Sequence, residues 1–227
     1  MFVNFDGFGA DTPMRLIRHI SRSPRPEILV TVKTQWFVRF ARREDLTTGD
    51  SLFGDPGWRE IAKSGTPEQK RTGLVNFYRD QLHDIGFTHT LTFELLDEGG
   101  HELLLIFGTT QEKGLEKMKD AVWRTDPIQG RRFRDPRDVN QLELGLGTEG
   151  ADLRLLKRQL LGRLECEGPQ SLDKLKDWAL LETIYRSAHI RPAVDALEQS
   201  GELTCERARK HEDFVVSLAN PTLFSGY

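Results

Sequence analysis

The stretch FTHTLTFELL-DEGG-HELLLIFGTT, residues 87–110, decides the fold of the first half of the chain. Residues 87–96 and 101–110 are rich in Leu, Ile, Phe and Thr, which is typical of strands. The acidic and glycine residues at 97–100 between them suit a hairpin turn. The sequence therefore predicts two antiparallel strands that end an α/β unit.

Two more strand patterns precede this hairpin. Residues 1–6, MFVNFD, are apolar and strand-like, and residues 27–32, EILVTV, form a β-branched run between breakers, typical of a strand buried on both faces. Between them, Asp11 as a capping residue and Pro13 as the first helical residue predict a short helix. The chain thus begins as strand, helix, strand.

The next part of the chain predicts a helix, a loop and a longer helix. Residues 36–40 are apolar enough for a partly buried helix, and the glycine and proline residues within 49–57 predict a loop. The segment 66–86 opens with a capping box and repeats apolar residues every four positions from Leu74 to Leu82. This pattern predicts an amphipathic helix that a glycine closes.

In this order the predicted elements match the second half of one doubly wound sheet, that of the S-adenosylmethionine-dependent methyltransferases. In that Rossmann-like sheet the last hairpin strand inserts antiparallel to the others. The chain has neither a Gly-x-Gly-x-Gly turn after an opening strand nor an acidic residue that closes a second strand and holds a ribose. We expect a partial methyltransferase-like domain over 1–126 without a cofactor. S-adenosylmethionine would bind only if a longer natural chain supplied the missing half.

Three short stretches carry a more specific similarity. Residues 5–9, Phe-Asp-Gly-Phe-Gly, resemble an Asp-Pro-Phe-Gly strand end, residues 107–110 resemble a Phe-Ala-Thr strand end, and residues 115–123 resemble a Met-Lys-x-Ala-Met-Trp helix. With them, residues 1–130 resemble the three-Cys-motif partner protein (TcmP) family, methyltransferase-like proteins that usually end in a winged helix. The chain departs from that family in lacking the cofactor half and in having Gly7 where the family has proline.

The resemblance implies an accessory role in prokaryotic nucleic-acid or mobile-element biology, beside a radical-type protein with a three-cysteine cluster motif. Asp6 and Phe8 are the candidate catalytic residues, because amino-group methyltransferases hold a carboxylate and a stacking ring at this strand end. Gly7 removes the rigidity of that motif, so a plain glycine turn fits the same residues. We expect no catalysis by this chain alone. The alternative is an amino-group methyltransferase whose cofactor half lies upstream of Met1.

The second half of the chain predicts a separate domain. Residues 127–150 are rich in glycine and proline and are predicted to be a linker. Residues 151–227 then contain three helical patterns, with Ser171 as a cap of the second and Gly201 as the end of the third, followed by two short strand patterns. Three helices and a two-stranded ribbon in this order predict a winged helix-turn-helix domain.

Cations precede the predicted third helix and occupy the polar tip between the last two strands, the two places where winged helices meet DNA. From 151 to 227, however, eleven Lys or Arg face twelve Asp or Glu, whereas a strong DNA binder is usually clearly basic. A protein-docking domain and a transcriptional regulator that uses its sheet to dimerise are therefore alternatives. The candidate nucleic-acid-binding residues are Arg186, Ser187, His189, Arg191, Arg207, Arg209 and Lys210.

Composition excludes other classes of protein. The 227 residues are 37% hydrophobic and 30% charged with a net charge of −3, which is typical of a globular chain and gives no overall attraction to nucleic acid or to an anionic membrane. Cys166 and Cys205 are predicted to be reduced, buried thiols, and neither they nor the six histidines have metal-ligand spacing, so we expect no metal. Without a basic leader in residues 1–10 or a long apolar run, we expect a cytoplasmic protein and no membrane partner.

The strand over residues 2–5 has a consequence for assembly. A parallel sheet cut beside its first strand leaves an open apolar edge, and such edges pair or aggregate unless they are covered. We therefore expect a homodimer or a partner bound through that edge. The resemblance adds a three-Cys-motif protein as a possible partner, and the winged helix adds DNA.

Overall fold

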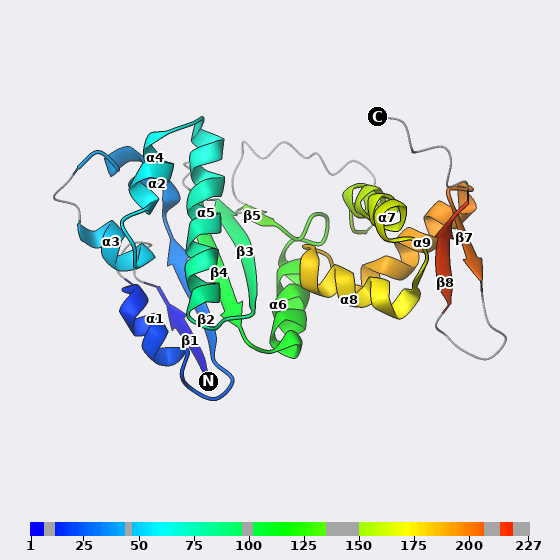
Figure 1. Ribbon diagram of the computed structural model, residues 1–227, viewed down its shortest axis with the longest axis horizontal. Helices are drawn as coiled ribbons and strands as arrows, with labels where there is room; N and C mark the ends of the chain where they lie inside the picture. The colour runs from blue at the N-terminus through cyan, green and yellow to red at the C-terminus, as the bar shows by residue number, and fades with distance from the viewer. Residues whose placement is uncertain (7–11, 44–46, 97–101, 135–149, 207–213, 220–227) are drawn as a thin grey trace. The chain divides into compact units, whose positions relative to one another are not determined.

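The chain forms two compact units (Figure 1). The computed structural model describes residues 1–6, 12–43, 47–96, 102–134, 150–206 and 214–219. Unit 1 comprises Met1–Asp126 with Arg131–Leu144, and unit 2 comprises Pro127–Gly130 with Gly145–Tyr227. Both units mix helices with a sheet, so the general α/β prediction is confirmed.

Unit 1 is built on a mixed five-stranded sheet in the order β1-β2-β4-β3-β5 (Figure 1). β1 pairs with β2 in parallel, β4 runs antiparallel to both β2 and β3, and β5 runs parallel to β3. These pairings confirm the predicted parallel pair and the predicted antiparallel pair, while the predicted turn at 97–100 lies outside the described residues. The strands are β1 (Phe2–Phe5), β2 (Glu27–Val32), β3 (His89–Leu96), β4 (Glu102–Thr109) and β5 (Arg132–Arg134).

Six helices are described in unit 1. They are α1 (Met14–Ile20), α2 (Thr34–Phe40), α3 (Thr47–Phe53), α4 (Trp58–Lys63), α5 (Pro67–Asp84) and α6 (Glu112–Thr125). The capping box of α5 is confirmed, because the Thr66 hydroxyl accepts from the Gln69 backbone N–H and the Gln69 side chain accepts from the Thr66 backbone N–H. The apolar stripe of α5 from Leu74 to Leu82 is buried, as its spacing predicts.

Three local predictions for unit 1 differ from the structure. Pro13 lies at the N-cap of α1 rather than at its first helical position. The loop predicted over 49–57 is wrong for its first half, which belongs to α3. Gly49 fits inside this helix because the Trp58 ring packs directly on it, so close that an added Cβ would lie 2.2 Å from the ring. The predicted linker over 127–150 contains β5, which joins the sheet beside β3.

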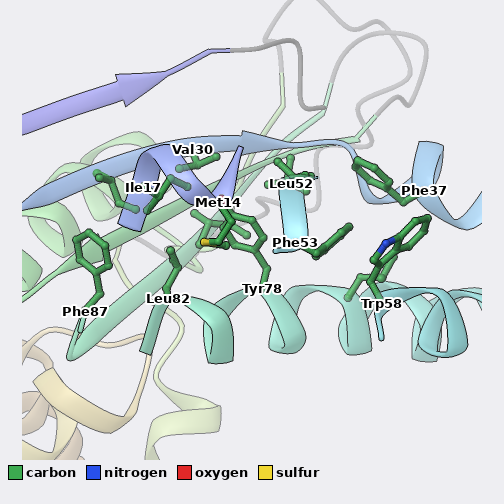
Figure 2. Packing of buried hydrophobic residues seen from close by; sticks show 14 of the residues in the cluster. Met14, Ile17, Val30, Phe37, Leu52, Phe53, Trp58, Tyr78, Leu82 and Phe87 are labelled. Carbon is green, nitrogen blue, oxygen red and sulfur yellow. The ribbon is translucent and has the colours of Figure 1, made fainter. Parts of the chain in front are cut away.

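The main core of unit 1 lies between one face of the sheet and helices α1 to α5. Ile28 and Val30 of β2 belong to it. Phe53 lies among other aromatic rings of this core (Figure 2). The Phe53 ring stacks on that of Trp58 with a centroid distance of 5.5 Å and meets the Tyr78 ring edge-on at 5.9 Å. On the opposite face of the sheet, α6 packs against β3 and β4.

The described part of unit 2 contains three α-helices, a short 3-10 helix and a three-stranded antiparallel sheet in the order β6-β8-β7. The predicted cap of the second helix is confirmed, because the Ser171 hydroxyl accepts from the backbone N–H of Lys174. Gly201 follows the third helix with a φ of 78°, a conformation that glycine adopts without strain. The elements are α7 (Arg154–Glu167), β6 (Gln170–Ser171), α8 (Leu172–Glu182), η1 (Ser187–His189), α9 (Ile190–Gln199), β7 (Leu203–Glu206) and β8 (Val215–Leu218).

Candidate functional site

The start of α9 is the part of unit 2 where four of the predicted nucleic-acid contacts come together. Helix α9 buries Ile190, Val194 and Leu197 against the rest of the unit, which leaves Arg191 and Pro192 exposed in its first turn. Proline is tolerated there because the first turn of a helix makes no backbone hydrogen bond through its N–H groups. The structure therefore presents the first turn of α9 to solvent.

Arg191 connects this first turn to the sheet. Its guanidinium lies over the ring of Phe214, 5.0 Å from the ring centroid, and Phe214 directly precedes β8. The guanidinium also pairs with Asp195 one turn later, with 3.3 Å between Nε and Oδ1. The Arg191 side chain is 50% exposed and that of Asp195 is 40% exposed, so solvent screens the pair and it contributes little to stability. Arg191 is thus an oriented cation at the surface.

Arg186 and His189 form the corner that precedes α9. His189 is only 6% exposed and its ring meets that of Tyr185 edge-on, with a centroid distance of 5.8 Å. Nε2 of His189 lies 2.9 Å from Nη2 of Arg186. Because a guanidinium only donates hydrogen bonds, Nε2 is the acceptor of this contact, and the backbone N–H of Arg186 lies 3.3 Å from Nδ1 of the same ring. These two residues hold the corner together, and the buried ring of His189 does not reach the surface.

Ser187 is also used inside the unit. Its hydroxyl donates to the backbone carbonyl oxygen of Lys176 in α8, at 3.0 Å, and so ties η1 to α8. Of the four predicted residues around the start of α9, Arg191 is the one most open to a ligand, and Arg186 and Ser187 are half-buried. The other three predicted contacts, Arg207, Arg209 and Lys210, lie outside the described residues.

The predicted catalytic pair of unit 1 is only half described. Asp6 follows β1 and its carboxylate is exposed, with a long hydrogen bond of 3.5 Å from the Thr31 hydroxyl. Phe8 lies outside the described residues. Asp6 therefore stands at the carboxyl end of a parallel strand, the side of open α/β sheets on which ligands bind.

A charged cluster that the sequence analysis missed lies at the same end of the sheet, where β1 and β3 finish. Arg71 of α5 pairs with Glu94 near the end of β3 and with Glu102 at the start of β4. Partial burial lowers the pKa of Arg71, but hydrogen bonds to Glu102 and Glu94 outweigh this and raise it. The cluster therefore joins α5 to β3 and β4, and its charged groups are engaged with one another. The alternation of polar residues in strand 89–96 could have predicted this cluster, because it places polar side chains on the face of β3 toward α5. Thr90 on that face accepts a hydrogen bond from Arg79 of α5.

Beside this cluster is a hollow of about 550 Å³ between α2 and α5. Thr34, Arg71 and Glu102 contribute polar groups to its lining, and Val38 and Leu96 contribute apolar ones. The Thr34 hydroxyl is buried without a hydrogen-bond partner. The size and mixed lining are those of a small-molecule pocket, but the two carboxylates neutralise Arg71 and no reactive pair is formed.

Metal and thiol chemistry have little support in the described parts of the chain. In these parts, no three His, Cys, Asp or Glu side chains come together in a way that could hold a metal ion. In the described residues neither Cys166 nor Cys205 is in a disulfide, but the prediction that both are buried is wrong for Cys166, which is exposed, and Cys205 is half-buried. Position 166 falls off the buried stripe of α7 that Leu156 and Leu160 define. None of the described helices is both long and apolar enough to cross a membrane.

Comparison with known proteins adds nothing to this geometry. No protein-family model, no curated protein and no solved structure matches the chain.

Proposed function

We propose that this chain is a non-catalytic accessory protein whose second unit binds duplex DNA through the start of α9. The observation that carries the proposal is the position of Arg191, a half-exposed cation oriented between the first turn of α9 and the start of β8. Recognition helices use their first turns to contact phosphates and base edges, and the adjacent ribbon grips the backbone. A cation at this junction can contact the same phosphates as both elements.

The arrangement of unit 2 supports the proposal that it is a winged helix-turn-helix. Its elements follow one another as helix, short strand, helix, helix, strand, strand, with β8 between β6 and β7. The connection from α8 to α9 is short and is fixed by the Ser187 and His189 contacts. A rigid connection of this kind holds a recognition helix in one orientation, which DNA reading requires.

The Arg191 pair with Asp195 is compatible with phosphate binding. Exposed ion pairs contribute at most about 1 kcal/mol, so the guanidinium can exchange the carboxylate for a phosphate at little cost. The acidic residues of the unit lower the affinity, because twelve of them oppose eleven basic ones between 151 and 227. We therefore expect weak binding that depends strongly on salt.

For unit 1, we propose that the sheet is the carboxy-terminal half of a methyltransferase-like sheet and that the chain is related to the three-Cys-motif partner proteins. The strand order β1-β2-β4-β3, with β4 antiparallel between its neighbours, supports the first part. The second part rests on the three sequence stretches at residues 5–9, 107–110 and 115–123. If it holds, a three-Cys-motif protein is the expected partner and the expected location is cytoplasmic.

Methyl transfer to an amino group is the second candidate function, and the exposed carboxylate of Asp6 at the end of β1 favours it. Calorimetry with S-adenosylmethionine separates the two candidates. The accessory proposal expects no saturable binding by this chain. A micromolar dissociation constant would favour methyl transfer instead.

Fluorescence anisotropy on a labelled duplex tests the DNA proposal. The logarithm of the affinity should fall with the logarithm of salt by about one unit for each phosphate neutralised. Changing Arg209 and Lys210 together to Ala should flatten this slope by about two and weaken all sequences alike. Arg191→Ala should weaken some sequences more than others if α9 enters the major groove.

The matched control is Arg158→Ala. Arg158 is exposed on α7, on the side away from the buried stripe that packs against the rest of the unit. Its loss removes the same charge from unit 2 without touching the start of α9, so affinity and slope should stay close to the wild-type values. Absence of binding at low salt, or equal effects of Arg191→Ala and Arg158→Ala, would contradict the proposal.

A further inference from the structure

Strand β1 is an open edge of the sheet in unit 1. It pairs on one side with β2, and the described residues contain no strand on its other side (Figure 1). The backbone N–H of Glu27 donates to the carbonyl oxygen of Met1, which therefore faces β2. Since backbone groups along a strand alternate between its two sides, those of Val3 also face β2, and those of Phe2 and Asn4 face outward. Two residues of β1 thus offer backbone donors and acceptors to another strand.

A groove runs beside this edge on the face of the sheet that carries α6. Its volume is about 500 Å³, and Phe2, Phe107 and Met118 form much of its apolar lining. Phe2 itself is 54% exposed, which is unusual for a phenylalanine in a strand. The charged residues around the groove are Arg25, Glu27, Lys113 and Lys117, three cations and one acid. The groove is therefore apolar with a net positive border.

We propose that a second copy of this chain adds its own β1 antiparallel to this edge, so that two sheets join into one. In such a two-fold pair, residues opposite each other must lie on the same face of the sheet. Pairing centred on Asn4 meets this condition and places Val3 opposite the partner's Phe5, both of which pack toward the main core. It also places Phe2 opposite the partner's Asp6.

The charged residues around the groove favour a second copy of β1 as the strand that binds there. Asp6 shares the α6 face with Phe2, because residues two apart on a strand point the same way, and it contacts Thr31 on that face. Pairing opposite Phe2 therefore brings the partner's Asp6 to the positively charged border formed by Arg25 and Lys117. Among the described residues, the exposed carboxylate of Asp6 has one long hydrogen bond, from the Thr31 hydroxyl, which a stronger contact can replace. Strand β1 is apolar and is followed by the acid Asp6, so it complements a groove that is apolar with a positive border.

The first test is the mass of the full chain by sedimentation velocity at micromolar concentration, where we expect a dimer. Asn4→Pro should give a monomer, because it removes an outward N–H and leaves the β1–β2 hydrogen bonds intact. Asn4→Ala keeps that N–H and should stay dimeric. Circular dichroism and hydrogen exchange of β2 show whether the proline variant has kept its fold. A wild-type monomer, or a proline variant that is still dimeric, would overturn the proposal.

A charge exchange tests the register and excludes another partner. Asp6→Arg alone, and Arg25→Glu with Lys117→Glu alone, should each weaken dimerisation about tenfold or more, because like charges then face each other. An equal mixture of the two variants should dimerise as well as the wild type, since both contacts are again between opposite charges. A mixture that stays monomeric would overturn the pairing of Asp6 with this border. The readout does not involve DNA, so it is independent of the proposed function.

Discussion

The two units surround a buried tyrosine in opposite ways. Tyr78 in unit 1 is fully buried among aromatic rings, and in the described parts of the chain its hydroxyl has no hydrogen-bond partner. Burial raises the pKa of this hydroxyl. Tyr185 in unit 2 is 3% exposed, but its hydroxyl donates to the backbone carbonyl oxygen of Asp152 at 2.9 Å. Apolar contacts therefore assemble the core of unit 1, while directional hydrogen bonds fix the corner of unit 2 on which the proposed DNA site depends.

Other polar groups follow the same division. In unit 1, the hydroxyl of Thr92 is also buried without a hydrogen-bond partner among the described residues. In unit 2, Ser187 and His189 both have hydrogen-bond partners. A buried hydroxyl is costly when it has no hydrogen-bond partner, so unit 1 should gain stability when such a hydroxyl is removed, and unit 2 should lose stability when a bonded one is removed.

The largest effect is expected for Lys119→Met. Burial lowers the pKa of Lys119 from 10.5 to about 7. Between these values the unfolded chain binds a proton that the folded chain does not, so the wild-type free energy of unfolding should rise with pH. Below pH 7 the amine of Lys119 is charged in both the folded and the unfolded chain, so the free energy of unfolding no longer changes with pH and stays at its lower value. The slope approaches about 1.4 kcal/mol per pH unit, and Lys119→Met should remove it and be most stabilising at low pH.

Urea denaturation of unit 1 from pH 6 to pH 9 measures this difference. The matched control is Lys63→Met on α4, whose side chain is 42% exposed and which should change the slope little. Equal pH dependence for the wild type and Lys119→Met would show that α6 does not desolvate this amine.

An intermediate loss is expected for Tyr185→Phe. The substitution leaves the carbonyl oxygen of Asp152 without its donor and should lower the free energy of unfolding of unit 2 by about 1–2 kcal/mol. Urea titration followed by hydrogen exchange and mass spectrometry separates the units, because each peptide reports the opening of its own unit. Unchanged protection in α8 and α9 would mean that this hydrogen bond does not hold the corner.

The smallest effect, and one of opposite sign, is expected for Tyr78→Phe. The same atom is removed, but here it has no partner, so the free energy of unfolding of unit 1 should rise by about 1 kcal/mol. The measurement is the same exchange experiment on peptides of α5. If both tyrosine variants lost stability equally, the contrast between the two units would be wrong.

Several elements could be predicted from the sequence because local chemistry dictates them. The Thr66–Gln69 capping box and the four-residue spacing of Leu74, Tyr78 and Leu82 are sufficient to define α5. The caps of α8 and α9 follow in the same way from Ser171 and Gly201, since a side-chain acceptor and a left-handed glycine act within one turn.

The missed elements depend on contacts between distant residues. Helix α3 forms despite Gly49 because the Trp58 ring covers that glycine, and β5 exists because Arg132–Arg134 find the free side of β3. At the candidate site, Arg191 lies in the predicted place, while His189 is turned into the unit by contacts with Tyr185 and Arg186. One sequence alone does not predict whether the ring of a histidine beside a helix start faces the core or the solvent.

Local sequence was sufficient to predict helix α5, the cap of α8 and the pairing of β1 with β2 and of β3 with β4, because periodicity and capping act over a few residues. Contacts between distant segments decide which described polar groups are buried without partners, that Arg71 joins β3 to β4 through Glu94 and Glu102, and that Asp6 shares a face with the groove at β1. These depend on which faces of distant elements meet. That is decided by packing, because each side chain must fill space beside neighbours that the local sequence does not name.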